Sequence, residues 1–223
     1  MFARTQNNVS RFSSTGRLLL IAILVLTMLT ACGGGAAPEP AASVGAISYI
    51  ATIADAPESA RVGIVVEDGK FAVYVCSLDD AFNLKSARWY SGDIGPDGAV
   101  SGVSPDGVQF QGVVNGDSFT GTLINTEGRT WTFSGSAIQA GGPAGLYRGI
   151  AEYNGQEVVV GAVVDPDGSF ASTVQVRGKI EFVTPVNSAP LRVDTTSLKV
   201  TIGDPGQQIA ALLVTTLKGV ELF

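Results

Sequence analysis

The sequence contains no histidine. Histidine is the commonest general base and the commonest metal ligand in proteins, so its absence excludes Ser-His-Asp and Cys-His catalytic arrangements and histidine-rich zinc sites. The chain also lacks a phosphate-binding glycine loop followed by lysine, and it lacks a Gly-x-Ser-x-Gly motif. We therefore assign no catalytic residue and expect neither a metal ion nor another cofactor.

Charged residues are scarce, at 15% of 223 residues, and the net charge is −6. The first 31 residues hold three arginines and no acidic residue. The rest of the chain therefore carries 11 basic and 20 acidic residues, a net charge of −9. Because a surface of this sign repels phosphate backbones, nucleic acid is not an expected partner.

The N-terminal segment has the layout of an export signal. Residues 1–17 are polar and basic, and residues 18–29 form an almost uninterrupted apolar run. Twelve helical residues span about 18 Å, which is short of a hydrocarbon core of about 30 Å. This length is typical of the apolar region of a signal peptide, whereas an uncleaved membrane anchor, the alternative, requires roughly 18 apolar residues or more.

The apolar run ends in Leu29-Thr30-Ala31-Cys32. This motif resembles the lipobox of bacterial lipoproteins, in which two small residues precede the cysteine that receives the lipid. The resemblance implies that residues 1–31 are a lipoprotein signal peptide and that Cys32 carries a diacylglycerol and a palmitate-type acyl chain. It further implies an extracytoplasmic protein whose partner is the membrane. Gly33 is neutral, which permits an outer-membrane destination if the cell has one.

Residues 32–46 read as a flexible tether, because Gly, Ala and Pro predominate there and cannot build a core. Cys76 is the second of only two cysteines. It ends the apolar stretch 71–76, so we expect a buried thiol that packs as a small hydrophobic side chain.

The exported part is predicted to be all-β. The chain has 28 glycines, and tight-turn signals separate runs of five to eight residues rich in Val, Ile, Thr and Phe. This pattern predicts an antiparallel β-meander, closed into a barrel or folded as a sandwich. The turn signals include 67–69, 96–98, 105–107, 115–117, 127–128, 154–155 and 166–168.

Two related halves are expected, 47–140 and 146–223, joined near Gly141-Gly142. This expectation is supported by an internal match, because residues 62–72 match 160–171 with one inserted proline. Near the C-terminus, Asp204-Pro205 favours a short helix from about residue 207, whereas Val214-Thr215-Thr216 favours a strand. Of these two interpretations we prefer the helix.

Residues 47–175 are similar to an uncharacterised bacterial extracytoplasmic all-β domain. The residues that carry the similarity are Tyr74-Val75-Cys76 through Trp89, Trp131-Thr132-Phe133 and Pro143 to Arg148. The similarity implies a fold and no activity.

Three functions remain open from the sequence. Trp89, Tyr90 and Trp131 are candidates to line a binding face, although such residues more often fill a core. Asp79 and Asp80 with Trp89 would suit a hydrolase of envelope glycans, which needs a carboxylate pair at about 5–10 Å. A purely structural surface domain is the third alternative. We expect a non-catalytic binding or interaction module, because no titratable cluster stands out.

Overall fold

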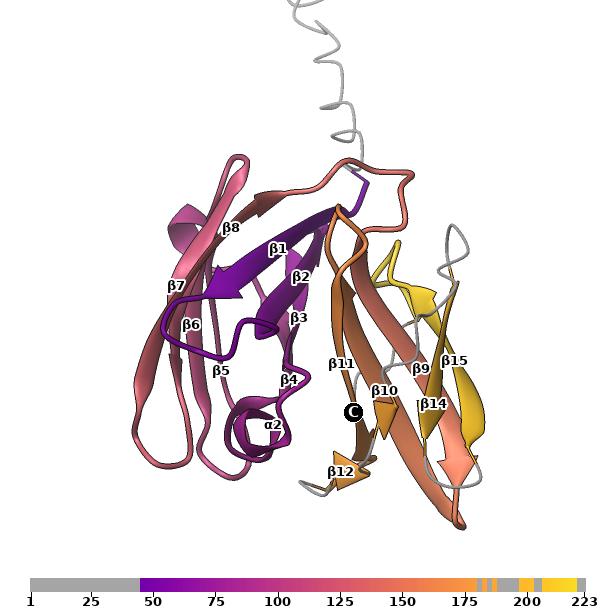
Figure 1. Ribbon diagram of the computed structural model, residues 1–223. Helices are drawn as coiled ribbons and strands as arrows, with labels where there is room; N and C mark the ends of the chain where they lie inside the picture. The colour runs from indigo at the N-terminus through magenta and orange to yellow at the C-terminus, as the bar shows by residue number, and fades with distance from the viewer. Residues whose placement is uncertain (1–44, 180–181, 184–185, 188–196, 203–205, 220–223) are drawn as a thin grey trace, which may run out of the picture. The chain divides into compact units, whose positions relative to one another are not determined.

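The computed structural model describes residues 45–179, 182–183, 186–187, 197–202 and 206–219, which belong to the compact unit Ser43–Phe223 (Figure 1). The signal peptide, the lipobox with Cys32 and most of the tether lie outside these residues, so the expectations for them stay predictions. Within the described part, no helix is long and apolar enough to cross a bilayer.

The first half of the unit is an antiparallel eight-stranded sheet with the order β4-β3-β2-β1-β8-β7-β6-β5. Tight turns with glycine at positive φ, such as Gly69 and Gly116, connect consecutive strands. The edge strands β4 and β5 are neighbours in the chain, and the ring of Tyr90 on β4 packs over Gly102 on β5, so the sheet is nearly closed into a barrel. Its strands are β1 (Ile47–Ile53), β2 (Arg61–Glu67), β3 (Lys70–Cys76), β4 (Trp89–Asp93), β5 (Ala99–Val103), β6 (Gln109–Asn115), β7 (Ser118–Ile124) and β8 (Thr130–Ala137).

The second half is an antiparallel seven-stranded sheet with the order β12-β11-β10-β9-β15-β14-β13, curved into a half-barrel. One of its faces buries its own apolar cluster, which includes Tyr147, Val160 and Leu198. Its strands are β9 (Gly145–Tyr153), β10 (Gln156–Val164), β11 (Phe170–Val176), β12 (Phe182–Val183), β13 (Val186–Asn187), β14 (Ser197–Ile202) and β15 (Gln207–Leu213).

These two sheets confirm the all-β class and the barrel or sandwich architecture. The predicted C-terminal helix is wrong, because Gln207–Leu213 is strand β15, which pairs with β14 and β9. In this strand Ile209 and Ala211 are buried while Ala210 is exposed, which is the period-two pattern of a sheet. The helix-start residues Asp204-Pro205 lie outside the described residues.

The interior of the near-closed barrel is filled by large side chains. Phe110 stacks on Phe133 at 5.5 Å between ring centroids, and Phe119 lies 5.0 Å from Phe133. Tyr49, Phe71 and other buried residues complete this cluster. The barrel is therefore a packed core, and any binding site of this unit has to lie outside it.

The faces of the two sheets that meet share a further apolar cluster, which includes Val65, Tyr74, Leu146 and Val163. Two glycines allow the two sheets to approach each other closely. A Cβ at Gly63 would lie 2.8 Å from Val163 Cγ2, and a Cβ at Gly161 would lie 2.2 Å from the Tyr74 ring. These glycines occupy matching places in the two repeated segments, which fold as the hairpins β2–β3 and β10–β11. Whether a duplication produced them stays a prediction.

Polar contacts also join the sheets. Arg61 Nε on β2 lies 2.7 Å from Asp165 Oδ2, at the end of β10. After β15 the chain returns to the first sheet, where the Glu67 carboxylate accepts hydrogen bonds from Thr216 Oγ1 at 2.7 Å and from the Leu217 backbone N–H at 2.6 Å. The two sheets are thus held together at several separated points.

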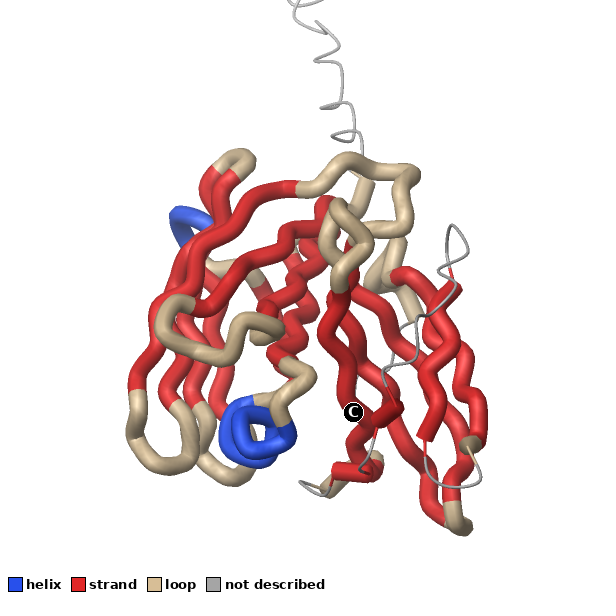
Figure 2. The backbone as a smooth tube through the Cα atoms, viewed as in Figure 1, coloured by secondary structure: helices blue, strands red, loops and turns tan. Residues whose placement is uncertain are grey.

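Helical structure is sparse within the described residues (Figure 2), consisting of α2 (Asp80–Ser86) and the single turn η1 (Pro96–Gly98). Helix α2 follows β3 and leads into β4, and it places Arg88 and Trp89 at the start of that edge strand.

Candidate functional site

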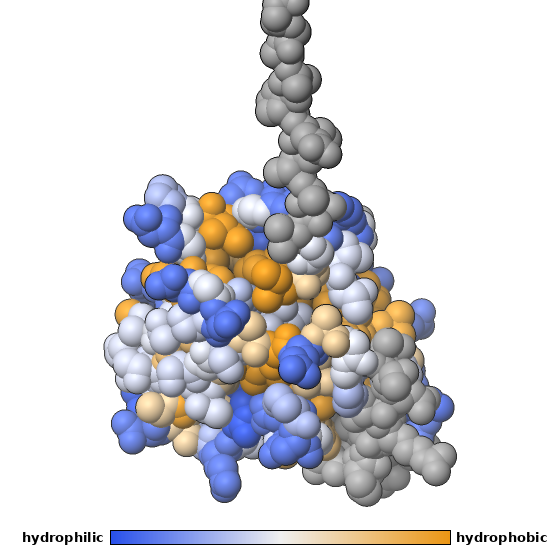
Figure 3. Space-filling view, turned by 90° about the horizontal axis from the view of Figure 1, so that it is seen from above, coloured by the Kyte–Doolittle hydropathy of each residue, from blue (hydrophilic) through white to orange (hydrophobic). Residues whose placement is uncertain are grey.

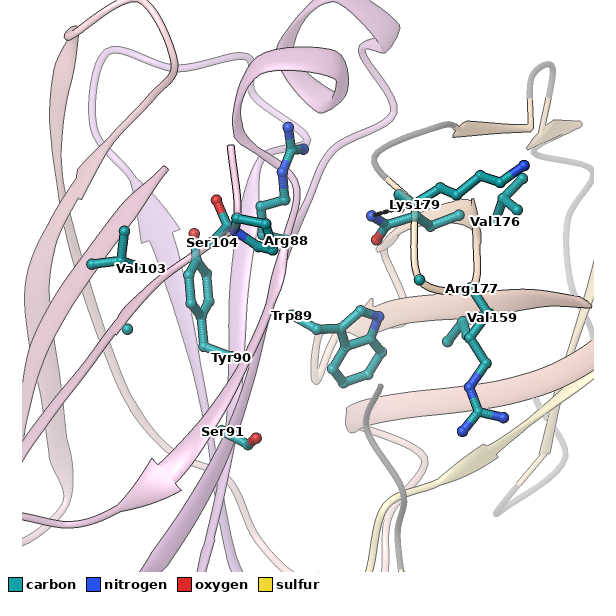
Figure 4. Close-up of a pocket in the computed structure, with 14 residues that line it drawn as sticks. Arg88, Trp89, Tyr90, Ser91, Val103, Ser104, Val159, Val176, Arg177 and Lys179 are labelled. Carbon is teal, nitrogen blue, oxygen red and sulfur yellow. Dashed lines mark hydrogen bonds between the residues drawn. The ribbon is translucent and has the colours of Figure 1, made fainter. Parts of the chain in front are cut away.

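A cleft of about 460 Å³ lies between the two sheets, where the edge strands β4 and β5 approach β10 and the end of β11 (Figure 4). We call it the inter-sheet cleft. Its volume falls in the range of sites that hold small organic molecules. Its lining consists of Arg88, Trp89, Tyr90, Ser91, Gly102, Val103, Ser104, Pro105, Val159, Gln175, Val176, Arg177, Gly178 and Lys179.

Trp89 is the main apolar wall on the side of the first sheet. Its indole extends from β4 toward β10 and β11 and is only 5% exposed (Figure 4). The ring stacks on Tyr74 with 4.3 Å between centroids, which fixes its orientation. Val159 on β10 belongs to the same apolar cluster and forms the opposing wall.

The indole nitrogen of Trp89 is a buried donor that lacks an acceptor. Nε1 is inaccessible to solvent and has no hydrogen-bond partner among the described residues. A buried donor left in this state costs about 1–3 kcal/mol, and most native donors avoid it. At the wall of an apolar cleft, such a donor is a candidate for ligand recognition.

Val103 is an exposed residue of the cleft lining. It ends strand β5 and is 70% exposed, the highest value among the large exposed apolar side chains of the described residues. On the face seen in Figure 3, apolar patches are interrupted by hydrophilic residues. The cleft brings exposed Val103 and the buried side chains of Trp89 and Val159 around one cavity.

Of the other two aromatic candidates, one lines the cleft and the other lies outside it. Tyr90 lines the cleft, but its ring packs against Phe110 at 5.3 Å, and its hydroxyl donates to the Val108 carbonyl at 3.4 Å. Burial raises the pKa of the Tyr90 hydroxyl well above its usual value. Trp131 is buried within the barrel, 5.3 Å from the Phe82 ring, and is not a lining residue. The structure therefore brings Trp89 and Tyr90 to one site and leaves Trp131 outside it.

Among the described residues, the cleft lining contains three cationic residues and no carboxylate. The Arg88 guanidinium pairs with Asp106, with 3.1 Å between Nε and Asp106 Oδ1. Its Nη1 and Nη2 donate hydrogen bonds to the carbonyls of Ala87 and Leu84, near the end of α2. Hydrogen bonding from the Arg88 guanidinium holds the pKa of Asp106 below its usual range. Arg88 thus serves to close the helix C-terminus and to pair with Asp106.

Arg177 is also paired at the edge of the cleft, with Nη1 2.6 Å from Glu157 Oε1. Gln175 donates its side-chain amide to the Lys179 carbonyl at 2.7 Å, which holds the turn after β11. The charges of Arg88 and Arg177 therefore help to fix the walls of the cleft.

Asp79 has a structural role. Its carboxylate accepts a 2.7 Å hydrogen bond from the Phe82 backbone N–H and so caps the N-terminus of α2, and Asp80 lies in the first turn of that helix. Neither aspartate is among the residues that line the cleft with Trp89. The structure thus does not assemble the carboxylate pair and tryptophan that a glycan hydrolase would require at one site.

Cys76 is buried between the sheets, as the sequence indicated, and its Sγ donates to the Ala171 carbonyl at 3.4 Å. Burial raises the pKa of this thiol far above its usual value, so it remains protonated. Among the described residues, no group of three or more Asp, Glu, His or Cys side chains is placed to hold a metal ion.

Sequence reasoning missed the wall contributed by the second sheet. Val159 and residues 175–179 lie more than 50 positions from Trp89 in the chain, and only the packing of the two sheets brings them together. The glycines Gly63 and Gly161, which permit that packing, were the available signal. No family model, curated protein or solved structure matches this chain.

Proposed function

We propose that this chain is an exported, lipid-anchored envelope protein that binds a small apolar ligand in the inter-sheet cleft without altering it chemically. The observation that carries the binding proposal is the cleft itself, a cavity of about 460 Å³ with Trp89, Val103 and Val159 among its walls. Sites for small molecules are typically concave, predominantly apolar and supplied with few polar groups.

The anchoring part of the proposal rests on the leader and on Leu29-Thr30-Ala31-Cys32. A lipid on Cys32 would hold the unit at a membrane surface through the Gly/Ala/Pro tether. A ligand that partitions into membranes would then be concentrated where the binding unit is held.

Metabolic labelling with an alkyne fatty acid tests the anchor. The wild-type chain should be labelled and should sediment with membranes, whereas Cys32→Ala should lose the label and be released. Cys76→Ala is the matched control and should keep both properties. Equal labelling of wild type and Cys32→Ala would contradict lipidation at this residue.

Titration of the Cys32→Ala chain with 1-N-phenylnaphthylamine, a neutral apolar fluorophore, tests the cleft. We expect saturable binding that Val103→Asp weakens roughly tenfold, because the probe would contact an ionised carboxylate. Val113→Asp is the matched control, since Val113 is also exposed but lies on β6 outside the cleft lining. A purely structural domain would show no saturable binding, and an equal effect of both variants would place the probe elsewhere.

A further inference from the structure

We propose that the ligand of the inter-sheet cleft is an acyl compound, an apolar chain that carries a carbonyl or carboxylate oxygen, and that this oxygen accepts a hydrogen bond from Trp89 Nε1. This inference rests on the proposed function and names the chemistry that the cleft recognises.

The indole N–H of Trp89 determines which kind of ligand atom can bind to it. Tryptophan offers a single polar group, an N–H that only donates, so its partner must be an acceptor. Trp89 is 5% exposed, its ring is fixed by stacking on Tyr74, and Nε1 has no partner among the described residues. The indole extends across the cleft from β4 toward the second sheet (Figure 4).

The surroundings of Trp89 select the rest of the ligand. Val103 and Val159 supply hydrocarbon walls, which favour an apolar chain. Among the described residues, the lining holds no carboxylate that would repel a ligand oxygen or compete with it for the indole donor, although the exported chain as a whole is acidic. An acceptor oxygen on a hydrocarbon chain matches both properties, whereas a cationic headgroup would meet the cationic residues of the lining and would find no acceptor in the indole N–H.

Two sources share this chemistry, the ester of a lipid and a free fatty acid. Because Nε1 is buried and has no acceptor among the described residues, a ligand oxygen in the cleft reaches it when side chains at the cleft wall shift on binding. A ligand held only at the mouth of the cleft would leave the indole unchanged.

Trp131 provides an internal control. Its Nε1 is likewise buried and unpartnered among the described residues, but the side chain lies in the barrel and not in the cleft. Because the chain has two tryptophans, a ¹⁵N-labelled sample gives two indole N–H signals, and Trp131→Phe assigns them.

The experiment uses the Cys32→Ala chain and measures displacement of 1-N-phenylnaphthylamine by methyl octanoate, octanoate and nonane. Trp89→Phe keeps an aromatic ring against Tyr74 and removes the donor. We expect it to weaken methyl octanoate or octanoate roughly five- to tenfold and nonane less than twofold, while Trp131→Phe changes none of them. The Trp89 indole proton should shift downfield with the acyl compounds and not with nonane.

The outcomes separate the two proposals. Stronger displacement by octanoate than by its ester identifies a free fatty acid as the source, and the reverse order identifies a lipid ester; either supports the inference. Displacement that is insensitive to Trp89→Phe, with an unshifted indole proton, overturns the inference and leaves the apolar cleft in place. Absence of fluorophore binding to the wild-type chain overturns the inference and the proposed function together.

Discussion

At the scale of single residues, Gly161 shows that the contact between the two sheets leaves no room for a side chain. The Tyr74 ring occupies the space that a side chain at this position would need, with a Cβ placed 2.2 Å from Tyr74 Cε1. The ring cannot withdraw freely, because it is fully buried and stacks on Trp89. A glycine that the sequence presents as a feature of one strand is thus required by a residue on another sheet.

Gly161→Ala should therefore destabilise the unit by about 1–3 kcal/mol, the usual cost of overpacking a core. It should also disturb the inter-sheet cleft, because Tyr74 can move only by displacing Trp89. Gly142→Ala is the matched control, since nothing lies within 4 Å of a Cβ there, and it should change stability by less than about 0.5 kcal/mol. Urea unfolding of both variants measures the difference, and equal midpoints would refute this account of the contact.

Asp106 makes a prediction about acid stability. Hydrogen bonding to Arg88 lowers its folded pKa below the unfolded value of about 3.9, so the pair stabilises the fold fully above that value. This stabilisation is lost as the pH falls through the lowered folded pKa.

Asp106→Asn should cost about 3 kcal/mol at pH 7, because it removes the carboxylate that pairs with the Arg88 charge, which is 3% exposed. Stability measured by urea unfolding at pH 7 and pH 3 should then fall less with acid in the variant than in the wild type. Asp93→Asn, whose partner Lys70 is exposed, should cost less than about 1 kcal/mol. Identical acid sensitivity in wild type and Asp106→Asn would contradict the assigned role.

At the scale of elements, the stability of helix α2 depends on the carboxylate of Asp79 at its N-terminus. Asp79→Ala removes the acceptor for the Phe82 N–H and should destabilise the unit by about 0.5–2 kcal/mol. Asp80→Ala, in the same helix turn without the capping bond, should cost less. Thermal unfolding compares the two. The cap account fails if Asp79→Ala is as stable as the wild type or if Asp80→Ala is the more damaging change.

The hairpins could be predicted from the sequence because turn and strand preferences depend on residues that are close together in the chain. Asp68-Gly69 and Asn154-Gly155 take the positive φ angles that tight turns need, and the strands beside them carry the apolar residues. Strand β15 was mispredicted because the cap signal of Asp204-Pro205 was weighed above the strand preference of Val214-Thr215-Thr216, and the alternation of Ile209 and Ala211 was not considered. Pairing with two neighbouring strands decided its conformation, and such pairing is not visible within the segment.

At the scale of the whole unit, the candidate site was only half visible in the sequence. Trp89 and Tyr90 were recognisable as aromatic residues at a strand start, and both line the cleft. Trp131, chosen on the same grounds, fills the barrel, because aromatic residues serve cores and sites alike. Val103 and Val159 carry no signal of their own. Val103 joins the site because β5 approaches β4 as the barrel nearly closes, and Val159 joins it because the two sheets pack face to face.

The central claim is that the inter-sheet cleft binds an apolar ligand. Mapping backbone amide chemical shifts tests this claim most directly. The ¹⁵N-labelled Cys32→Ala chain would be titrated with 1-N-phenylnaphthylamine and its shifts assigned by residue. We predict that they cluster on the cleft lining, at Trp89, Val103, Val159 and Gly178, and leave Phe119 in the barrel core unmoved. Shifts centred on Leu84 or Leu212, exposed apolar residues outside the cleft, or no saturable shifts at all, would contradict the claim.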